Sequence, residues 1–226
     1  MNIKYNKHKQ EIKDDPVLDW MLEAKEFIQK NANKLIVAVI AIVVLISGVS
    51  IFNSMQKSAQ QKAQDAFGMA VLSYQANDMD KAIEGFKSVI TNYGSSTSAV
   101  FSSYLLGTIY NEQGKFDDAI NAFQKAIKSN KSADFVNGQA LEAIAVSYEA
   151  KGDTESALKF LQKALEDKRI SYRFAAIRYK MALLNSSKDE SLAKKLCNEI
   201  ISDTTAIDYH QKAENLLATF NAKSAG

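Results

Sequence analysis

Residues 103–126 of this chain read SYLLGTIYNEQGKFDDAINAFQKA, and residues 141–164 read LEAIAVSYEAKGDTESALKFLQKA. The two stretches match at a spacing of 38 residues, with a tyrosine, a glycine and two alanines in the same places (Tyr110 and Tyr148, Gly114 and Gly152, Ala119 and Ala157, Ala126 and Ala164). Repeats of this length are typical of an array in which each unit packs on the next. The sequence therefore predicts an all-α solenoid.

Two further copies flank this pair. The earlier one, at residues 67–90, keeps the tyrosine, the alanine and the aromatic residue, while a weaker one at 172–202 has Ala193 and Cys197 in the packing positions. A last helix at 206–220 would close the array. We therefore expect about four helical hairpins plus a closing helix, forming a repeat domain at 63–222 that is followed by a tail at 223–226.

Each copy has the composition of a helix–turn–helix unit. Gly107 has no side chain, so the neighbouring helix can approach closely, and Tyr110 covers the gap. In the second helix, the small Ala119 is expected to pack against the first helix, with Phe123 and Ala126 completing the contact. These positions define the expected core of each repeat.

The turns of the units carry glycine and aspartate. Gly114 and Gly152 tolerate the positive-φ backbone that ends many helices, and Asp117 or Asp153 is expected to cap the helix that comes next. Because the acidic pair Asp117-Asp118 opens a helix, capping is a better interpretation of it than catalysis.

This pattern resembles the tetratricopeptide repeat. The matching residues are Leu106, Gly107, Tyr110, Gly114, Ala119, Phe123 and Ala126. The usual proline after each unit is missing, and the spacing of 36–38 residues exceeds the ideal 34, which predicts longer loops such as 129–135. The resemblance covers about residues 63–202 and implies a scaffold for protein interactions, although a scaffold alone does not identify its partner.

The uncharged run LIVAVIAIVVLISGVSIF occupies residues 35–52. An eighteen-residue helix is about 27 Å long, close to the hydrocarbon thickness of a bilayer. We therefore predict a transmembrane helix at 35–52, followed by a polar connector at 53–62. The 34-residue head is too long for a signal peptide and no cleavage pattern lies close behind the run, so we expect an uncleaved anchor.

Lysines near the two ends of this run indicate its orientation. Lys25, Lys30 and Lys34 precede the run, against Lys57 and Lys62 after it. Positive charge favours the cytoplasmic side, so we expect a single-pass protein with its N-terminus in the cytoplasm and the repeat domain on the far side.

The head, residues 1–34, ends in an expected amphipathic helix at 16–34 that starts at Asp14-Asp15-Pro16. Its apolar stripe comprises Val17, Trp20, Met21, Ala24, Phe27 and Ile28. Such a helix suits the surface of the lipid bilayer, and it equally suits a groove on a partner membrane protein. We expect Trp20 and Phe27 to make this contact. Gly48, in the far half of the span, is expected to contact a partner span.

The composition excludes several functions. The net charge of +2 does not support a nucleic-acid partner. Only His8 and His210 are present, without a Cys/His cluster or a glycine-rich phosphate loop, so we expect no metal, cofactor or enzymatic activity. Cys197 falls at a packing position and is expected to be a buried small hydrophobic residue.

The first helix of each unit is expected to line the concave face of the array. The candidate protein-binding residues there are Phe101, Tyr104, Thr108, Asn111, Gln139, Glu142 and Val146, which would accept an extended or helical peptide. Alternatively, Phe101 and Tyr104 pack between helices. Four basic residues, Arg169, Arg173, Arg178 and Lys180, form either a solvated face or a site for an anionic partner.

The layout as a whole, with the approach EFIQKNANKLIVAVIAIVV into the span and a first repeat near Ala63, resembles the YfgM family. That resemblance implies a non-catalytic ancillary subunit of the bacterial SecYEG translocon in the inner membrane, with a periplasmic repeat domain that binds a PpiD-like chaperone or emerging client polypeptides. A scaffold in another envelope assembly is the alternative. A cytosol-facing receptor is a third possibility, although the lysine, asparagine and arginine residues that clamp chaperone tails are replaced here by Gly68, Leu72, Leu105, Gln139 and Ala143.

Overall fold

The computed structural model describes residues 16–128 and 136–225, and within these ranges the chain is helical with no strand. The chain divides into two compact units, Met1–Ser58 and Ala59–Gly226. The expected loop at 129–135 and the expected cap at Asp14-Asp15 lie outside the described residues.

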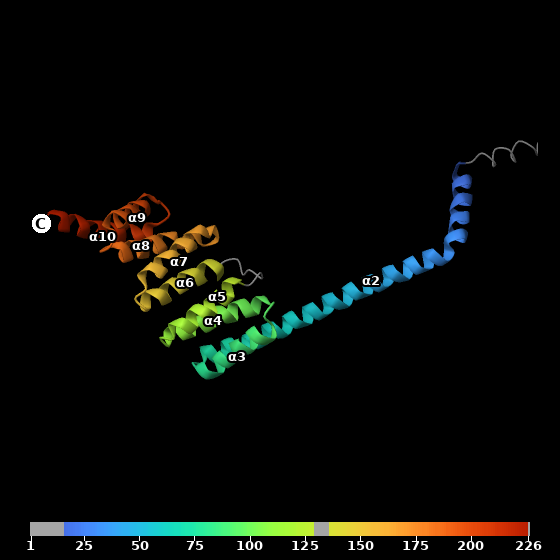
Figure 1. Cartoon of the computed structure of the whole chain (residues 1–226), viewed down its shortest axis with the longest axis horizontal. Coiled ribbons are helices and arrows are strands. Elements are labelled where there is room, and N and C mark those ends of the chain that lie inside the picture. The colour runs from blue at the N-terminus through green and yellow to red at the C-terminus, as the bar shows by residue number, and fades with distance from the viewer. Residues whose placement is uncertain (1–15, 129–135, 226) are drawn as a thin grey trace, which may run out of the picture. The chain divides into compact units, whose positions relative to one another are not determined.

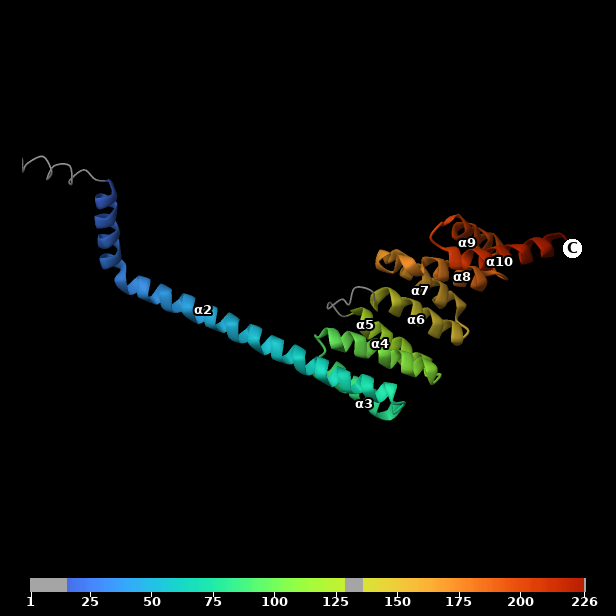
Figure 2. The same ribbon diagram turned by 180° about the vertical axis from the view of Figure 1, so that it is seen from behind.

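The first long element, α2, runs from Pro16 to Gln75 without interruption. The predicted amphipathic helix, span and polar connector are therefore consecutive stretches of one helix. Figures 1 and 2 both show a bend in the blue, N-terminal part of α2. Residues 59–75 of α2 belong to the second unit, where they form the first helix of the array.

The second unit consists of helical hairpins in chain order. Its elements after α2 are α3 (Met79–Asn92), α4 (Thr97–Glu112), α5 (Phe116–Lys128), α6 (Val136–Ala150), α7 (Thr154–Glu166), the 3₁₀ helix η1 (Lys168–Arg173), α8 (Phe174–Asn185), α9 (Glu190–Ser202) and α10 (Ile207–Ala225). Figures 1 and 2 show α3 to α10 following one another along the array. The prediction of an all-helical array of tetratricopeptide-like repeats is confirmed, and α10 continues through residues 223–225, where we expected a tail.

The repeated positions form the core. Ala119, Ala126, Ala157, Leu161, Ala193 and Cys197 are all fully buried. A Cβ atom added at Gly107 would lie 2.7 Å from ring carbons Cδ1 and Cε1 of Phe123, so the close approach that the glycine predicts is present. Since interiors are packed without spare room, only glycine fits this position unless the Phe123 ring moves.

The turns use the expected residues with one exception. Gly114 and Gly152 have φ of 72° and 81°, and the Asp153 carboxylate caps α7 by accepting a 3.0 Å hydrogen bond from the Ser156 N–H. The prediction that Asp117 caps a helix is wrong. Because α5 begins at Phe116, Asp117 lies one residue inside the helix, and its carboxylate pairs instead with Lys151 of the next hairpin.

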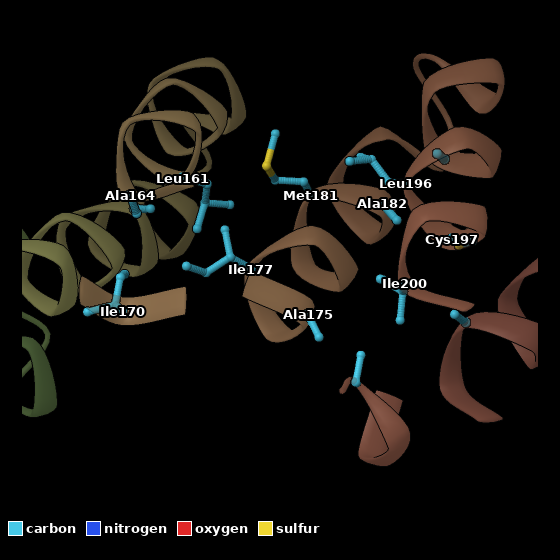
Figure 3. Packing of buried hydrophobic residues seen from close by; sticks show 14 of the residues in the cluster. Leu161, Ala164, Ile170, Ala175, Ile177, Met181, Ala182, Leu196, Cys197 and Ile200 are labelled. Carbon is cyan, nitrogen blue, oxygen red and sulfur yellow. The ribbon is translucent and has the colours of Figure 1, made fainter. Parts of the chain in front are cut away.

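The largest core cluster lies in the C-terminal half of the array. In Figure 3 the side chains of Leu161 (α7) and Ile177 (α8) point toward each other, and Leu196 and Cys197 come from the facing helix α9. Cys197 is fully buried, and burial raises the pKa of its thiol. It is therefore a packing residue, as the sequence predicts.

Candidate binding surfaces of the repeat array

Residues of α4, α6 and η1 surround a hollow of about 270 Å³, which we call the first-helix hollow. Its lining consists of Tyr104, Gln139, Glu142, Ala143, Val146 and Arg173. Four of these residues, Tyr104, Gln139, Glu142 and Val146, are candidates from the sequence. Tyr104 lies on α4 and the other three lie on α6. They meet because these two helices are the first helices of consecutive repeats.

The charges of the first-helix hollow are already paired. The Arg173 guanidinium donates two hydrogen bonds to the Glu142 carboxylate, at 3.1 and 2.7 Å, and these bonds raise the pKa of Arg173. The Gln139 amide donates a 3.0 Å hydrogen bond to the hydroxyl of Tyr172, whose side chain is otherwise exposed. Burial, with the nearby Glu142 charge, raises the pKa of Tyr104. A ligand in this hollow would contact the paired Glu142 and Arg173 side chains and the apolar Ala143 and Val146.

The other three sequence candidates make contacts within the array. The rings of Phe101 and Phe67 have centroids 6.1 Å apart, the Thr108 hydroxyl donates to the Tyr104 carbonyl, and the Asn111 side chain accepts from Ser147. Tyr104 has both roles, since its ring also lies 5.5 Å from that of Phe123. Interhelix packing therefore accounts for part of the predicted surface.

The four basic residues of the expected patch all have acidic neighbours. Their ion pairs are Arg169 with Asp167, Arg173 with Glu142, Arg178 with Glu199 and Asp203, and Lys180 with Glu149. Two of the pairs join successive hairpins. Arg173 and Lys180 thereby link one repeat to the next, and the four paired side chains do not form a free basic face.

A larger hollow, of about 610 Å³, lies between the second helices α3 and α5 where both pack against α4, and we call it the second-helix hollow. Its lining consists of Lys87, Ile90, Thr91, Leu106, Tyr110, Asp118, Asn121, Ala122, Gln124 and Lys125. The sequence did not predict this site, because the candidate residues all came from first helices. The sequence feature that could have indicated the site is the presence of Lys87 and Lys125 on the second helices of two consecutive repeats.

The apolar run of α2 has no covering within the structure. Its large side chains from Ile36 to Phe52 are each more than half exposed, as are those of Trp20 and Phe27. A Cβ atom added at Gly48 would meet nothing within 4 Å. The helix is long and apolar enough to cross a membrane, on length and composition alone.

Within residues 16–128 and 136–225, no group of three or more His, Cys, Asp and Glu residues could hold a metal ion. The side-chain chemistry of both hollows is instead suited to noncovalent contact, with hydroxyl, amide, ammonium and apolar groups at the surface.

The comparisons with solved structures identify the same fold. A tetratricopeptide repeat protein from Parabacteroides merdae aligns with a TM-score of 0.56 at 20% identity, over 71% of this chain and 62% of the other. The protein MamA aligns with a TM-score of 0.53 at 19% identity, over 70% and 88% of the two chains. A putative kinesin light chain with tetratricopeptide-like repeats, from Podospora anserina, gives 0.51 at 15% identity, over 73% and 95%.

No curated protein sequence matches this chain. The sequence model of one family, the tetratricopeptide repeat-like domain, matches residues 25–178, which is well over half of the chain. Tetratricopeptide repeat folds are protein-interaction scaffolds and are generally non-catalytic. The chain belongs to the tetratricopeptide repeat-like domain family.

Proposed function

We propose that this protein is a membrane-anchored, non-catalytic adaptor whose repeat array binds protein partners outside the cytoplasm. One observation carries the proposal: an interaction array follows, in the same helix α2, an eighteen-residue apolar stretch, none of which is buried within the structure. The anchor would fix the location of the array, and the array would supply the binding surface.

The exposed apolar stretch supports a membrane location on energetic grounds. Each Val, Leu or Ile side chain gains about 1.5–3 kcal/mol when it leaves water. Ile40, Val43 and Leu45, for example, are each more than half exposed. A helix also satisfies its own backbone hydrogen bonds, as a segment in hydrocarbon must. A bilayer covers such a helix from all sides without a specific partner.

The family match supports treating the apolar stretch as part of the functional unit. It begins at Lys25, ten residues before Leu35, and so includes the whole apolar run as well as the first hairpins. The excess of lysines before the run supports a cytoplasmic N-terminus and a periplasmic array in the bacterial inner membrane.

The resemblance to the YfgM family supports a finer assignment. On that basis the partners are the SecYEG translocon and a PpiD-like chaperone, and the array holds the chaperone or an emerging client polypeptide. A scaffold in outer-membrane biogenesis or a secretion apparatus is the alternative, and the partners recovered from membranes distinguish the two assignments.

We assign partner binding to the first-helix hollow. The Glu142 and Arg173 charges are satisfied by each other, so a ligand does not have to supply a countercharge. Gln139 offers amide groups to a peptide backbone, and Val146 offers an apolar wall. This chemistry suits an uncharged polypeptide segment with an apolar side chain, in keeping with clients of varied sequence.

A photo-cross-linking experiment tests this assignment. A photoreactive amino acid replaces Gln139 in the full chain, and a matched variant carries it at the exposed Lys159 of α7. Cross-linked partners are purified from membranes in mild detergent and identified by mass spectrometry. We expect SecY and an isomerase-like membrane chaperone to be recovered from the Gln139 variant.

Three outcomes bear on the proposal. Recovery of neither protein contradicts the translocon assignment, and recovery of other envelope proteins supports the alternative scaffold. Equal recovery from the Lys159 variant contradicts the assignment of the hollow, because Lys159 lies outside it.

A further inference from the structure

The second-helix hollow has an apolar floor with charged residues around it. Ile90 of α3 is half-buried, and beneath it Leu106 of α4 and Ala122 of α5 are almost fully buried, so the floor between the three helices is apolar. The Tyr110 ring lies beside them. At about 610 Å³, the hollow falls within the range of ligand pockets, which is about 300–1,000 Å³.

The cations of this hollow differ from those of the first-helix hollow. Among the described residues, neither Lys87 nor Lys125 forms an ion pair, and both are exposed. The ammonium groups of Lys87 and Lys115 lie 5.8 and 5.9 Å from the centroid of the Tyr110 ring. One acidic residue, Asp118, lines the hollow. The surface is therefore net positive, with cations available to an incoming ligand.

We propose that the second-helix hollow is a second docking site, which binds an acidic amphipathic helix of a partner protein. The apolar face of such a helix would lie against Ile90 and the Tyr110 ring, above the buried Leu106 and Ala122, as in helix-in-groove recognition. Its carboxylates would pair with Lys87 and Lys125, and charge complementarity of this kind selects partners and speeds their association. The array would then hold two partners, one on each set of helices.

The repeat itself supplies a matched control position. Lys163 stands one repeat of 38 residues after Lys125, at the equivalent exposed position of α7, and it lies outside the hollow. A charge effect specific to the hollow must appear at Lys125 and not at Lys163. The Asp118 carboxylate provides an opposite test, because its neutralisation should strengthen the binding of an acidic helix.

The experiment measures peptide binding to the full chain in detergent by fluorescence anisotropy. The probe is a fluorescein-labelled helix-forming peptide of about four turns that repeats Glu-Leu-Leu-Glu, and its counterpart has lysine at every glutamate position. We expect saturable binding of the acidic peptide only. Lys87→Glu with Lys125→Glu should weaken that binding about tenfold, because two attractions become repulsions.

Four further variants complete the design. Asp118→Asn should tighten binding severalfold, whereas Lys163→Glu should leave it unchanged. Val146→Trp, in the first-helix hollow, should also leave it unchanged, which separates this site from the one in the proposed function. Asn121→Trp, at an exposed position on the rim, should block the peptide sterically without changing any charge. Thermal unfolding midpoints check that all variants remain folded.

The proposal fails if the acidic peptide does not bind at concentrations up to about 1 mM, the dissociation constant of a very weak complex. It also fails if the lysine counterpart binds equally well, or if Lys163→Glu is as harmful as the double change. Vesicles containing phosphatidylglycerol provide a last arm. If they bind through Lys87 and Lys125 while the acidic peptide does not, the surface is a membrane contact and the proposal is overturned.

Discussion

The apolar stretch of α2 and the core of the repeat array contain the same kinds of side chain in opposite surroundings. Val43 is 56% exposed, whereas Leu161 is 0% exposed. Both lie in helices, and the difference comes from the residues around each of them in the sequence. Leu161 occupies a position that recurs every 36–38 residues together with small residues that admit a neighbouring helix. Val43 belongs to a run without a polar face, which nothing in the described part of the chain buries. The proposed membrane anchor rests on this second kind of pattern.

The largest difference between the two regions should appear on truncation of a side chain. Leu161→Ala leaves a cavity in the core and should lower the free energy of unfolding by about 2–5 kcal/mol. Val43→Ala removes two exposed methyl groups and should leave the unfolding of the array unchanged. Urea unfolding of the full chain in detergent, followed by circular dichroism, measures both. If Val43→Ala lowered the free energy of unfolding as much as Leu161→Ala does, the apolar stretch would have to pack against the array.

Replacing a packed glycine and an open glycine by alanine should change the free energy of unfolding in opposite directions. Gly107→Ala would force a Cβ atom against the buried Phe123 ring, which should cost about 1–3 kcal/mol. Gly68, in α2, has open space around it, so Gly68→Ala should raise stability by up to about 1 kcal/mol through the better helix propensity of alanine. The same unfolding assay applies. A stabilised Gly107→Ala variant would contradict the packing described for the first and second helices.

These residues also show how far the sequence determines the fold. The spacing of alanine, glycine and aromatic residues predicted the hairpins, the turn glycines and the burial of Cys197, because each depends on contacts within one repeat or between neighbouring repeats. The position of the Asp117 cap was wrong because it depends on where α5 begins, and one residue changes the outcome. Helix boundaries are set by the sum of weak local preferences, which a motif does not resolve.

The candidate site was predictable only in part. Gln139, Glu142 and Val146 share a face of α6 by helical periodicity, and together with Tyr104 of α4 they do surround a hollow. The pairing of Glu142 with Arg173 was not predictable, since it depends on the course of the chain through η1. The second-helix hollow depends on how α3 and α5 each pack against α4, a geometry that no sequence motif specifies.

A third prediction concerns the exposed glycine of the apolar stretch. Gly48→Leu should weaken co-purification of the membrane partner severalfold, because a bulky side chain keeps the partner helix away. Since an added Cβ atom meets nothing within 4 Å, the chain itself should tolerate the change, and unfolding of the array should not alter. Immunoblotting of detergent extracts measures the recovery. If the Gly48→Leu variant recovers as much partner as the unchanged chain, the stretch does not contact a partner helix at Gly48.

The smallest expected effect is a shift in one titration. Burial raises the pKa of Tyr104 above the ordinary value of 10.0, because the charged phenolate loses its hydration. The stability that this shift contributes is fully present below pH 10 and is lost as the pH rises through the folded-state pKa. In an ultraviolet titration, Tyr104→Phe should remove a component from the alkaline end of the tyrosine curve. If the component that Tyr104→Phe removes instead titrates near the ordinary tyrosine pKa of 10.0, the Tyr104 hydroxyl is hydrated and the expected shift is contradicted.

The most direct test of the membrane-anchored adaptor uses cysteine labelling in intact spheroplasts. The native Cys197 is buried, so exposed thiols can be introduced on a Cys197→Ala background by Glu23→Cys before the apolar stretch and Ser187→Cys in the turn before α9. A membrane-impermeant maleimide should label Ser187→Cys, while Glu23→Cys should react only after the membrane is opened, with both variants in the membrane fraction. Reversed labelling would contradict the orientation. Recovery of both variants in the soluble fraction would contradict the anchor.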